Sequence, residues 1–248
     1  GVIAAATVAF GAQAKTKPPP EPIADTPIMK AVSSYILLDR TGSMSDIWDE
    51  ALGSVNAYAE AVGKVEDGEA DDLKTSVTLA VFDHQEGLQY DVLRKNIEPD
   101  AWTNVTNKEV TPRGMTPLFD AINRTITMAE ADNPEKAVIV IMTDGYENSS
   151  REVTREGAKA ALDRAEARGW EVVFLGAEFA SFGDADAVGV SSNKQMAVSA
   201  GTLSITQERL AKKARDYGKG VSEEIEFDAE DRAVAEEEDV KERKGPNR

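Results

Sequence analysis

The chain has 248 residues, no cysteine and a formal net charge of −17 at pH 7. This length favours one main domain with tails, because a single core stops growing at roughly 250–300 residues. The acidic excess excludes nucleic acid as an expected partner, since phosphates are bound by clustered Lys and Arg. The lack of cysteine excludes disulfides, thiolate metal sites and a cysteine nucleophile. No apolar run reaches the roughly 20 residues that span a bilayer, so we expect no membrane span.

The first 30 residues differ in composition from the rest. Residues 1–14, GVIAAATVAFGAQA, are apolar and end in a small-x-small pattern typical of signal-peptide cleavage. They fit either a signal-peptide remnant or a flexible, Ala-rich arm. Residues 15–30 contain a triple proline, which favours an extended linker. We expect an exported, periplasmic or cell-surface protein if residues 1–14 are a signal remnant, and otherwise a cytoplasmic or virion-associated one.

From residue 31 onward, short β-rich runs alternate with longer amphipathic segments. Near-continuous apolar runs, typical of strands covered on both faces, occupy residues 33–39, 136–144 and 170–177, with a shorter run at 196–200. Two further runs, 74–83 and 88–94, flank a short turn with Gly87 and predict an antiparallel hairpin at a sheet edge. Helices are predicted at 47–62, 116–131, 154–169 and about 204–217. This alternation predicts an α/β fold with a central, mostly parallel sheet and helices on both faces.

Local signals predict where two of these helices begin. Ser45 or Asp46 is placed as the N-cap of the first helix. Thr116 is placed as the cap of the second helix, with Pro117 at its first position. Beyond residue 220 the chain becomes strongly acidic with few apolar residues, so residues 221–248 are predicted to form a solvated, disordered tail or a fraying helix. Residues 31–220 then form the folded domain.

Two of the most apolar strands end in a carboxylate, Asp39 and Asp144. Parallel α/β sheets bind ligands beyond the carboxyl ends of their strands, so both side chains should lie at one edge. In YILLDRTGSMSD, Thr41 and Ser43 alternate after Asp39 and should point to its side of an extended loop, while Thr116 starts a helix at the same edge. This all-oxygen set suits a hard cation such as Mg²⁺, which binds ligands at about 2.0–2.1 Å. The spacing of Asp39, Thr41 and Ser43 is weak evidence alone. The prediction depends on the expected placement of Thr116 and Asp144 at the same edge of the sheet.

Three motifs, LLDRTGSM, RGMTPLFDAI and IVIMTDGYEN, together resemble the von Willebrand factor type A (VWA) domain with its metal-ion-dependent adhesion site (MIDAS). The resemblance covers about residues 31–200 and implies a three-layer, Rossmann-like fold. It implies that one magnesium or manganese ion is bound, directly or through water, by Asp39, Thr41, Ser43, Thr116 and Asp144. Thr41 stands where the family usually has Ser but keeps the hydroxyl.

The resemblance also implies a binding function without catalysis, in which an Asp or Glu carboxylate of a partner protein completes the coordination of the ion. The surrounding loops would then select the partner. The loop residues expected near a partner are Met44, Asp46, Met115, Tyr146, Glu147, Asn148 and Phe179.

Other functions fit parts of the sequence. A strand that ends in Asp before a hydroxyl-rich turn also opens phosphatases of the haloacid dehalogenase type, with Asp184 and Asp186 as later magnesium ligands. Those enzymes place a general acid where Thr41 stands, and a threonine hydroxyl is far too weak an acid. We therefore interpret Asp184 and Asp186 as surface residues that cap a short helix. His84, the only histidine, is interpreted as a turn residue rather than a triad base. A structural component with a closed metal site stays open as an alternative.

Overall fold

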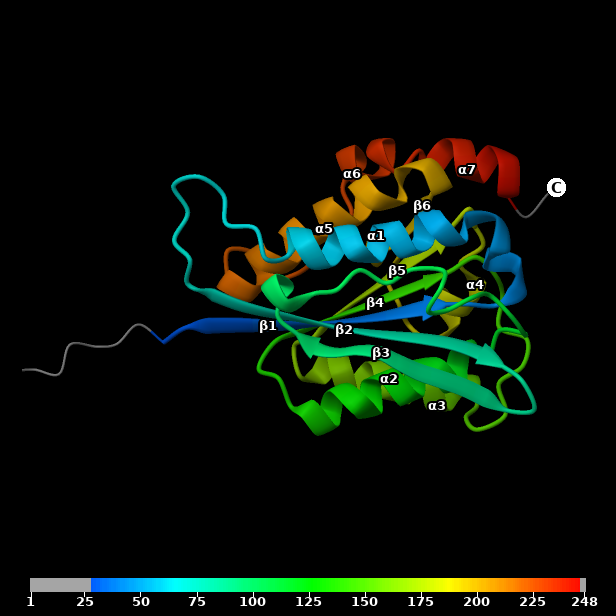
Figure 1. Ribbon diagram of the computed structural model, residues 1–248. Coiled ribbons are helices and arrows are strands. Elements are labelled where there is room, and N and C mark those ends of the chain that lie inside the picture. Colours follow the sequence, from blue (N-terminus) through cyan, green and yellow to red (C-terminus); the bar gives the residue numbers. More distant parts are fainter. Residues whose placement is uncertain (1–27, 246–248) are drawn as a thin grey trace, which may run out of the picture.

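The computed structural model describes residues 28–245, in which a six-stranded sheet lies between two layers of helices (Figure 1). The strands are β1 (Lys30–Asp39), β2 (Leu73–His84), β3 (Leu88–Ile97), β4 (Ala137–Thr143), β5 (Glu171–Ala177) and β6 (Gln195–Val198). Their order is β3-β2-β1-β4-β5-β6, and only the β2–β3 pair is antiparallel. The predicted α/β fold class, with one antiparallel edge strand, is confirmed. The predictions for residues 1–27 lie outside the described part of the chain.

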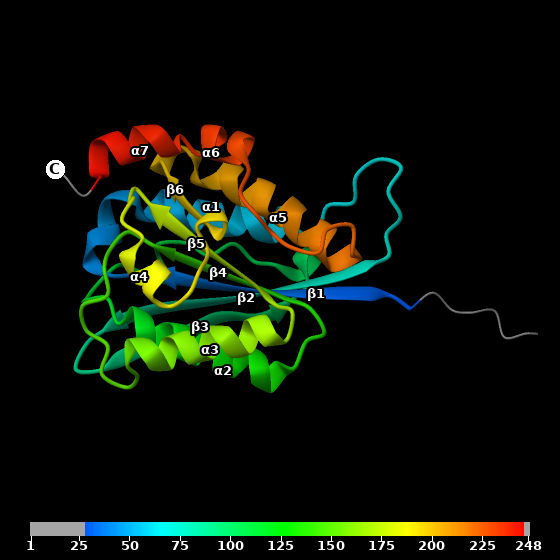
Figure 2. The ribbon, with the colours of Figure 1, turned by 180° about the vertical axis from the view of Figure 1, so that it is seen from behind.

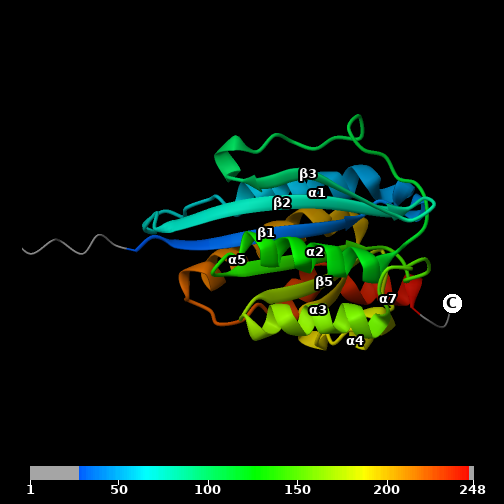
Figure 3. The same cartoon turned by 90° about the horizontal axis from the view of Figure 1, so that it is seen from below.

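The helices cover both faces of the sheet. α1 (Trp48–Ala61) and α5 (Leu203–Lys219) lie on one face, and α2 (Leu118–Asp132) and α3 (Arg155–Ala167) lie on the other (Figures 2 and 3). Alternate residues of β1 enter the two cores, Ile36 on the α1 side and Leu37 on the α2 side. This double burial explains why the central strands are apolar throughout.

Several short helices complete the described part of the chain. None of the helices within residues 28–245 is long and apolar enough to cross a bilayer. The short elements are α4 (Gly183–Ala187), α6 (Ala229–Val234), α7 (Glu237–Lys244) and four 3₁₀ helices, η1 (Gly42–Ile47), η2 (Pro99–Ala101), η3 (Ser192–Lys194) and η4 (Ala200–Thr202).

The cap predicted for the first helix is wrong. The hydroxyl-rich segment after β1 forms η1 before α1 begins at Trp48, and the residue at the N-cap position, Ile47, makes no side-chain cap. The Ser45 hydroxyl instead donates to the carbonyl of Gly42 at 2.7 Å. This tight turn carries Met44 into the core, where it is fully buried. The expected contact of Met44 with a partner is therefore also wrong.

The prediction of a disordered tail is wrong for residues 221–245, which form α6 and α7 on the α5 side of the sheet (Figure 1). The few apolar residues here, among them Ile225, Phe227 and Ala235, are buried in the same core as α1 and α5. Asp228 and Asp231 form a capping box at the start of α6. The acidic composition of this segment predicted disorder, because composition alone does not show that many of the charged side chains have specific partners in the fold.

The C-terminal segment also covers the free edge of β6. Ser199 donates its backbone N–H to Ala235 at 2.9 Å. The N–H of Ala197 is bound at 2.8 Å by the carboxylate of Glu237, which Arg232 and Lys241 also contact. An uncovered edge strand offers unpaired N–H groups to other chains, so this segment blocks edge-to-edge pairing.

Replacing Glu237 by Ala should therefore destabilise the protein. The Glu237 side chain is only 2% exposed, and its loss leaves the N–H of Ala197 buried without an acceptor. We expect the free energy of unfolding in urea to fall by about 1–3 kcal/mol. The neighbouring Glu238, 83% exposed, gives the matched control, and Glu238→Ala should change it by less than about 0.5 kcal/mol. Equal effects of the two substitutions would show that the covered edge adds no stability.

Candidate metal site

Asp39 and Asp144 lie side by side because β1 and β4 are adjacent parallel strands. Asp39 ends β1 and is fully buried. One of its carboxylate oxygens accepts the backbone N–H of Thr41 at 2.7 Å, and the other accepts the hydroxyl of Thr143 at 2.6 Å. Thr143 ends β4, so the hydrogen bond joins the ends of the two strands directly in front of Asp144.

The loop after β1 completes this cluster. The Ser43 hydroxyl donates to a carboxylate oxygen of Asp144 at 2.8 Å and lies 3.2 Å from the hydroxyl of Thr41. The backbone N–H of Gly42 donates to Gly114, which ties this loop to the one before α2. Hydrogen bonds thus connect Asp39, Thr41, Ser43 and Asp144 at the carboxyl edge of the sheet.

Thr116 lies beside this cluster without a side-chain hydrogen bond to it. Its backbone exchanges two hydrogen bonds with Asn148, at 2.8 and 3.0 Å. A Cβ placed on Gly145 would lie 4.0 Å from the Thr116 hydroxyl oxygen, so this hydroxyl faces the loop that carries Asp144. The prediction that Thr116 caps α2 is wrong, because α2 begins at Leu118 with no side-chain cap from its flanking residue.

Two carboxylates, whose positioning role the sequence did not reveal, hold the loop after β4 against α2. Asp120, buried in the first turn of α2, accepts the backbone N–H groups of Arg151, Glu152 and Val153 at 2.8, 3.0 and 2.9 Å. Glu147 makes the reciprocal contact from the loop to the helix, because its carboxylate accepts the N–H of Phe119 in α2 at 3.0 Å. These contacts fix Thr116 relative to Asp144. The only signal in the sequence is that each acidic residue belongs to a motif that also carries a predicted ligand.

Several residues expected near a partner do line the surface beside the cluster. A groove of about 650 Å³ is bordered by Ser43, Asp144, Asp46, Tyr146 and Phe179, among others. Met115 is also exposed, but on the loop before α2. Glu147 is wrong as a free partner contact, because its carboxylate is committed to Phe119, Ser149 and Ser150.

The electrostatics of the cluster favour a positive charge. Burial raises the pKa of Asp39 to about 7, and the neighbouring Asp144 carboxylate acts in the same direction. Burial also raises the pKa of Asp144. A cation between them would relieve both the desolvation and the mutual repulsion.

The donor set fits a hard divalent cation. It contains only carboxylate and hydroxyl oxygens, the ligands that magnesium and manganese accept. Within residues 28–245 no group of three or more acidic, histidine or cysteine side chains could hold a metal, so the hydroxyls of Thr41, Ser43 and Thr116 would have to contribute.

The residues of the alternative functions are committed to other contacts. Asp184 accepts the N–H of Glu147 at 2.8 Å and Asp186 accepts the side-chain amide of Gln195 at 2.7 Å. Neither caps α4, so that interpretation is wrong. His84 is buried at the end of β2 rather than placed in an exposed turn, and its backbone pairs with Met115.

Asp120→Ala should loosen the loop that carries Asp144. Three backbone N–H groups lose their acceptor, and hydrogen bonds to charged groups contribute about 1.5–3 kcal/mol each when isolated. We expect the free energy of unfolding to fall by about 3 kcal/mol, and the amides of residues 151–153 to exchange hydrogen faster. Asp163→Ala, which removes an exposed pair with Lys159 on α3, is the control. Unchanged amide exchange in Asp120→Ala would contradict the positioning role.

No protein-family model matches the chain, and no curated protein matches its sequence. Solved structures do share its fold. The vWF domain of the type V pili tip protein Mfa5 from Porphyromonas gingivalis superposes with a TM-score of 0.55 at 10% identity, covering 79% of this chain and 97% of that domain. The pilus adhesin SpaC from Lactobacillus rhamnosus GG gives 0.56 at 14% identity, covering 75% of this chain and 30% of SpaC.

A third similar structure is proximal thread matrix protein 1 from the mussel byssus, with a TM-score of 0.53 at 15% identity, covering 76% of this chain and 47% of that protein. This chain therefore spans less than half of SpaC and of the byssus protein. These likenesses show that the chain has a VWA-like three-layer α/β fold.

Proposed function

We propose that this chain is an adhesion module that engages a partner protein through one magnesium or manganese ion. The ligands would be Asp39, Thr41, Ser43, Thr116 and Asp144. The observation that carries the proposal is the hydrogen-bonded cluster of two carboxylates and two hydroxyls at the carboxyl edge of the sheet, with the Thr116 hydroxyl beside it. An ion held largely by hydroxyls and water stays a strong Lewis acid, which an acidic side chain of a partner can satisfy.

The exposure of the cluster supports an open site rather than a closed, structural one. Asp39 and Thr41 are buried, but Ser43 is exposed and Asp144 is half-buried. Ser43 and Asp144 also line the groove, so a partner can approach from that side.

Binding is favoured over phosphoryl transfer by the chemistry at position 41. A phosphatase of the haloacid dehalogenase type needs a carboxylic acid there to protonate the leaving group. Thr41 is buried, with its hydroxyl 3.2 Å from that of Ser43. Asp184 and Asp186, the residues that would hold magnesium in that chemistry, make other hydrogen bonds.

The structurally similar proteins also support an adhesive role. They include a pilus adhesin and the vWF domain of a pilus tip protein. A surface or exported location agrees with this role.

Ser43→Ala should weaken divalent-ion binding while the fold is kept, because Ser43 is an exposed residue of η1. We expect the affinity for Mg²⁺ and Mn²⁺, measured by isothermal titration calorimetry, to fall about tenfold or more. The stabilising shift of the thermal midpoint with millimolar Mg²⁺ should shrink accordingly. Asp39→Ala should abolish both the binding of the divalent ion and the stabilising shift of the thermal midpoint.

Ser45→Ala is the matched control for Ser43→Ala. It removes a hydroxyl two positions away that bonds only the carbonyl of Gly42 among the described residues. Circular dichroism should show native secondary structure in all variants. If Asp39→Ala or Ser43→Ala bound magnesium as tightly as the unaltered protein, the proposed ligand set would be wrong.

A further inference from the structure

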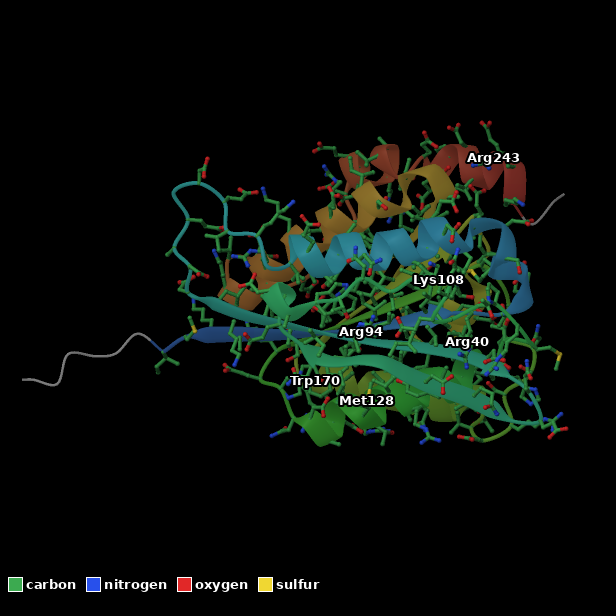
Figure 4. The ribbon with its side chains drawn as sticks, in the orientation of Figure 1. Arg40, Arg94, Lys108, Met128, Trp170 and Arg243 are labelled. Atoms are coloured by element: carbon green, nitrogen blue, oxygen red, sulfur yellow. The ribbon has the colours of Figure 1, made fainter. Side chains whose placement is uncertain are left out.

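The C-terminal end of α7, which carries Arg243, lies at the same edge of the sheet as the carboxyl end of β1 (Figures 1 and 4). The groove of about 650 Å³ separates the two. Ser43, Asp46 and Asp144 border it on the metal side, and Arg243 and Lys244 border it on the α7 side. The proposed metal site therefore opens into a groove that has a basic opposite wall.

The fold holds this basic wall in place. Arg243 donates to the carboxylate of Glu178 at 2.8 Å, and Glu178 in turn accepts the backbone N–H of Ala200 at 2.8 Å. One helical turn earlier, Val240 is buried in the core. The position of the last turn of α7 is thus set by packing on β6 and by the Arg243–Glu178 pair.

On the α7 side of the groove, Arg243 and Lys244 lie with one carboxylate, Glu178, so this side is basic although the protein as a whole is acidic. The chain carries 45 acidic and 28 basic residues, and many of the basic ones are ion-paired. Lys244 forms no ion pair with any residue from 28 to 245, and the Arg243 side chain is 48% exposed despite its pair. Positive charge left open on an acidic protein attracts an anionic partner to that place.

An aromatic pair forms the third wall. Tyr146 is 53% exposed and packs edge-to-face on Phe179, with ring centroids 5.0 Å apart and an interplanar angle of 84°. Both residues line the groove. Exposed Tyr and Arg side chains around a pocket are the residue types that contribute most to protein interfaces.

We infer that the groove binds a segment of a partner protein that carries two acidic side chains and an apolar one. The first carboxylate would meet the ion, the second would meet Lys244 and Arg243, and the apolar side chain would pack on Tyr146 and Phe179. The inference rests on the proposed metal site, to which it adds a second, metal-independent contact. The α7 wall then selects segments with two acidic residues over segments with one.

The test uses fluorescence anisotropy with labelled peptides that carry two aspartates separated by leucine residues. Matched peptides have one aspartate replaced by asparagine. In millimolar Mg²⁺ the unaltered protein should bind the best two-aspartate peptide about tenfold more tightly than its matched peptide, and chelator should weaken both. Lys244→Glu should remove this preference and should leave the Mg²⁺ affinity unchanged or raised.

Lys64→Glu provides the control with the same change of charge. Lys64 is exposed and lies just beyond the end of α1 that is remote from η1, so its reversal should leave the peptide preference intact. Thermal unfolding of each variant confirms that the fold is kept.

The possible failures of this test are distinguishable. If Mg²⁺ stabilises the protein but no two-aspartate peptide is preferred, or Lys244→Glu keeps the preference, the groove inference is overturned and the metal site stands. If Mg²⁺ neither binds nor stabilises the unaltered protein, the proposed function fails and the groove inference fails with it.

Discussion

Parallel pairing of β1 with β4 is the constraint on which the candidate site depends. The register sets Leu38 opposite Met142, which brings Asp39 to the level of Thr143 and leaves Asp144 as the next residue. A slip of one residue would turn the side chains of β1 to the opposite faces of the sheet. The register is strongly specified because both faces are buried, with Ile36 and Leu37 in separate cores. The apolar core thus determines where two carboxylates meet.

The acidic residues near this edge divide into two groups by how fully their oxygens are used. Asp120 accepts three backbone N–H groups and Glu147 accepts three backbone N–H groups and a hydroxyl. Asp39 accepts two hydrogen bonds and Asp144 accepts one from Ser43, although a carboxylate offers about four acceptor positions. The unused acceptor capacity is therefore concentrated where the cation is proposed, while the satisfied carboxylates hold the loops around it.

The sheet, the hairpin and the meeting of Asp39 with Asp144 were predictable because they depend on periodicity and on the geometry of parallel strands. The starts of α1 and α2 were not, since η1 forms before α1 and the first turn of α2 is bound by Glu147 and Ser150 from a loop about 30 residues away. The C-terminal helices were missed for a similar reason. Residues 221–245 bury few apolar side chains, but tertiary hydrogen bonds, such as that between Glu237 and Ala197, hold the segment on the sheet. Such hydrogen bonds cannot be predicted from composition. That Thr116 binds the ion stays a prediction.

The helix dipole explains the order of charges along α7, but it does not explain where α7 lies in the fold. Acidic residues fill its first turn and basic residues its last, which is the order that the helix dipole favours. Helix stability therefore explains why Arg243 and Lys244 are basic. It does not explain why they face the groove, because that depends on Glu237 and Val240 fixing the helix on β6. With eight residues, α7 is about 12 Å long, so one segment covers the sheet edge at its start and reaches the proposed binding surface at its end. Changes that detach it from β6 must therefore also remove the basic wall.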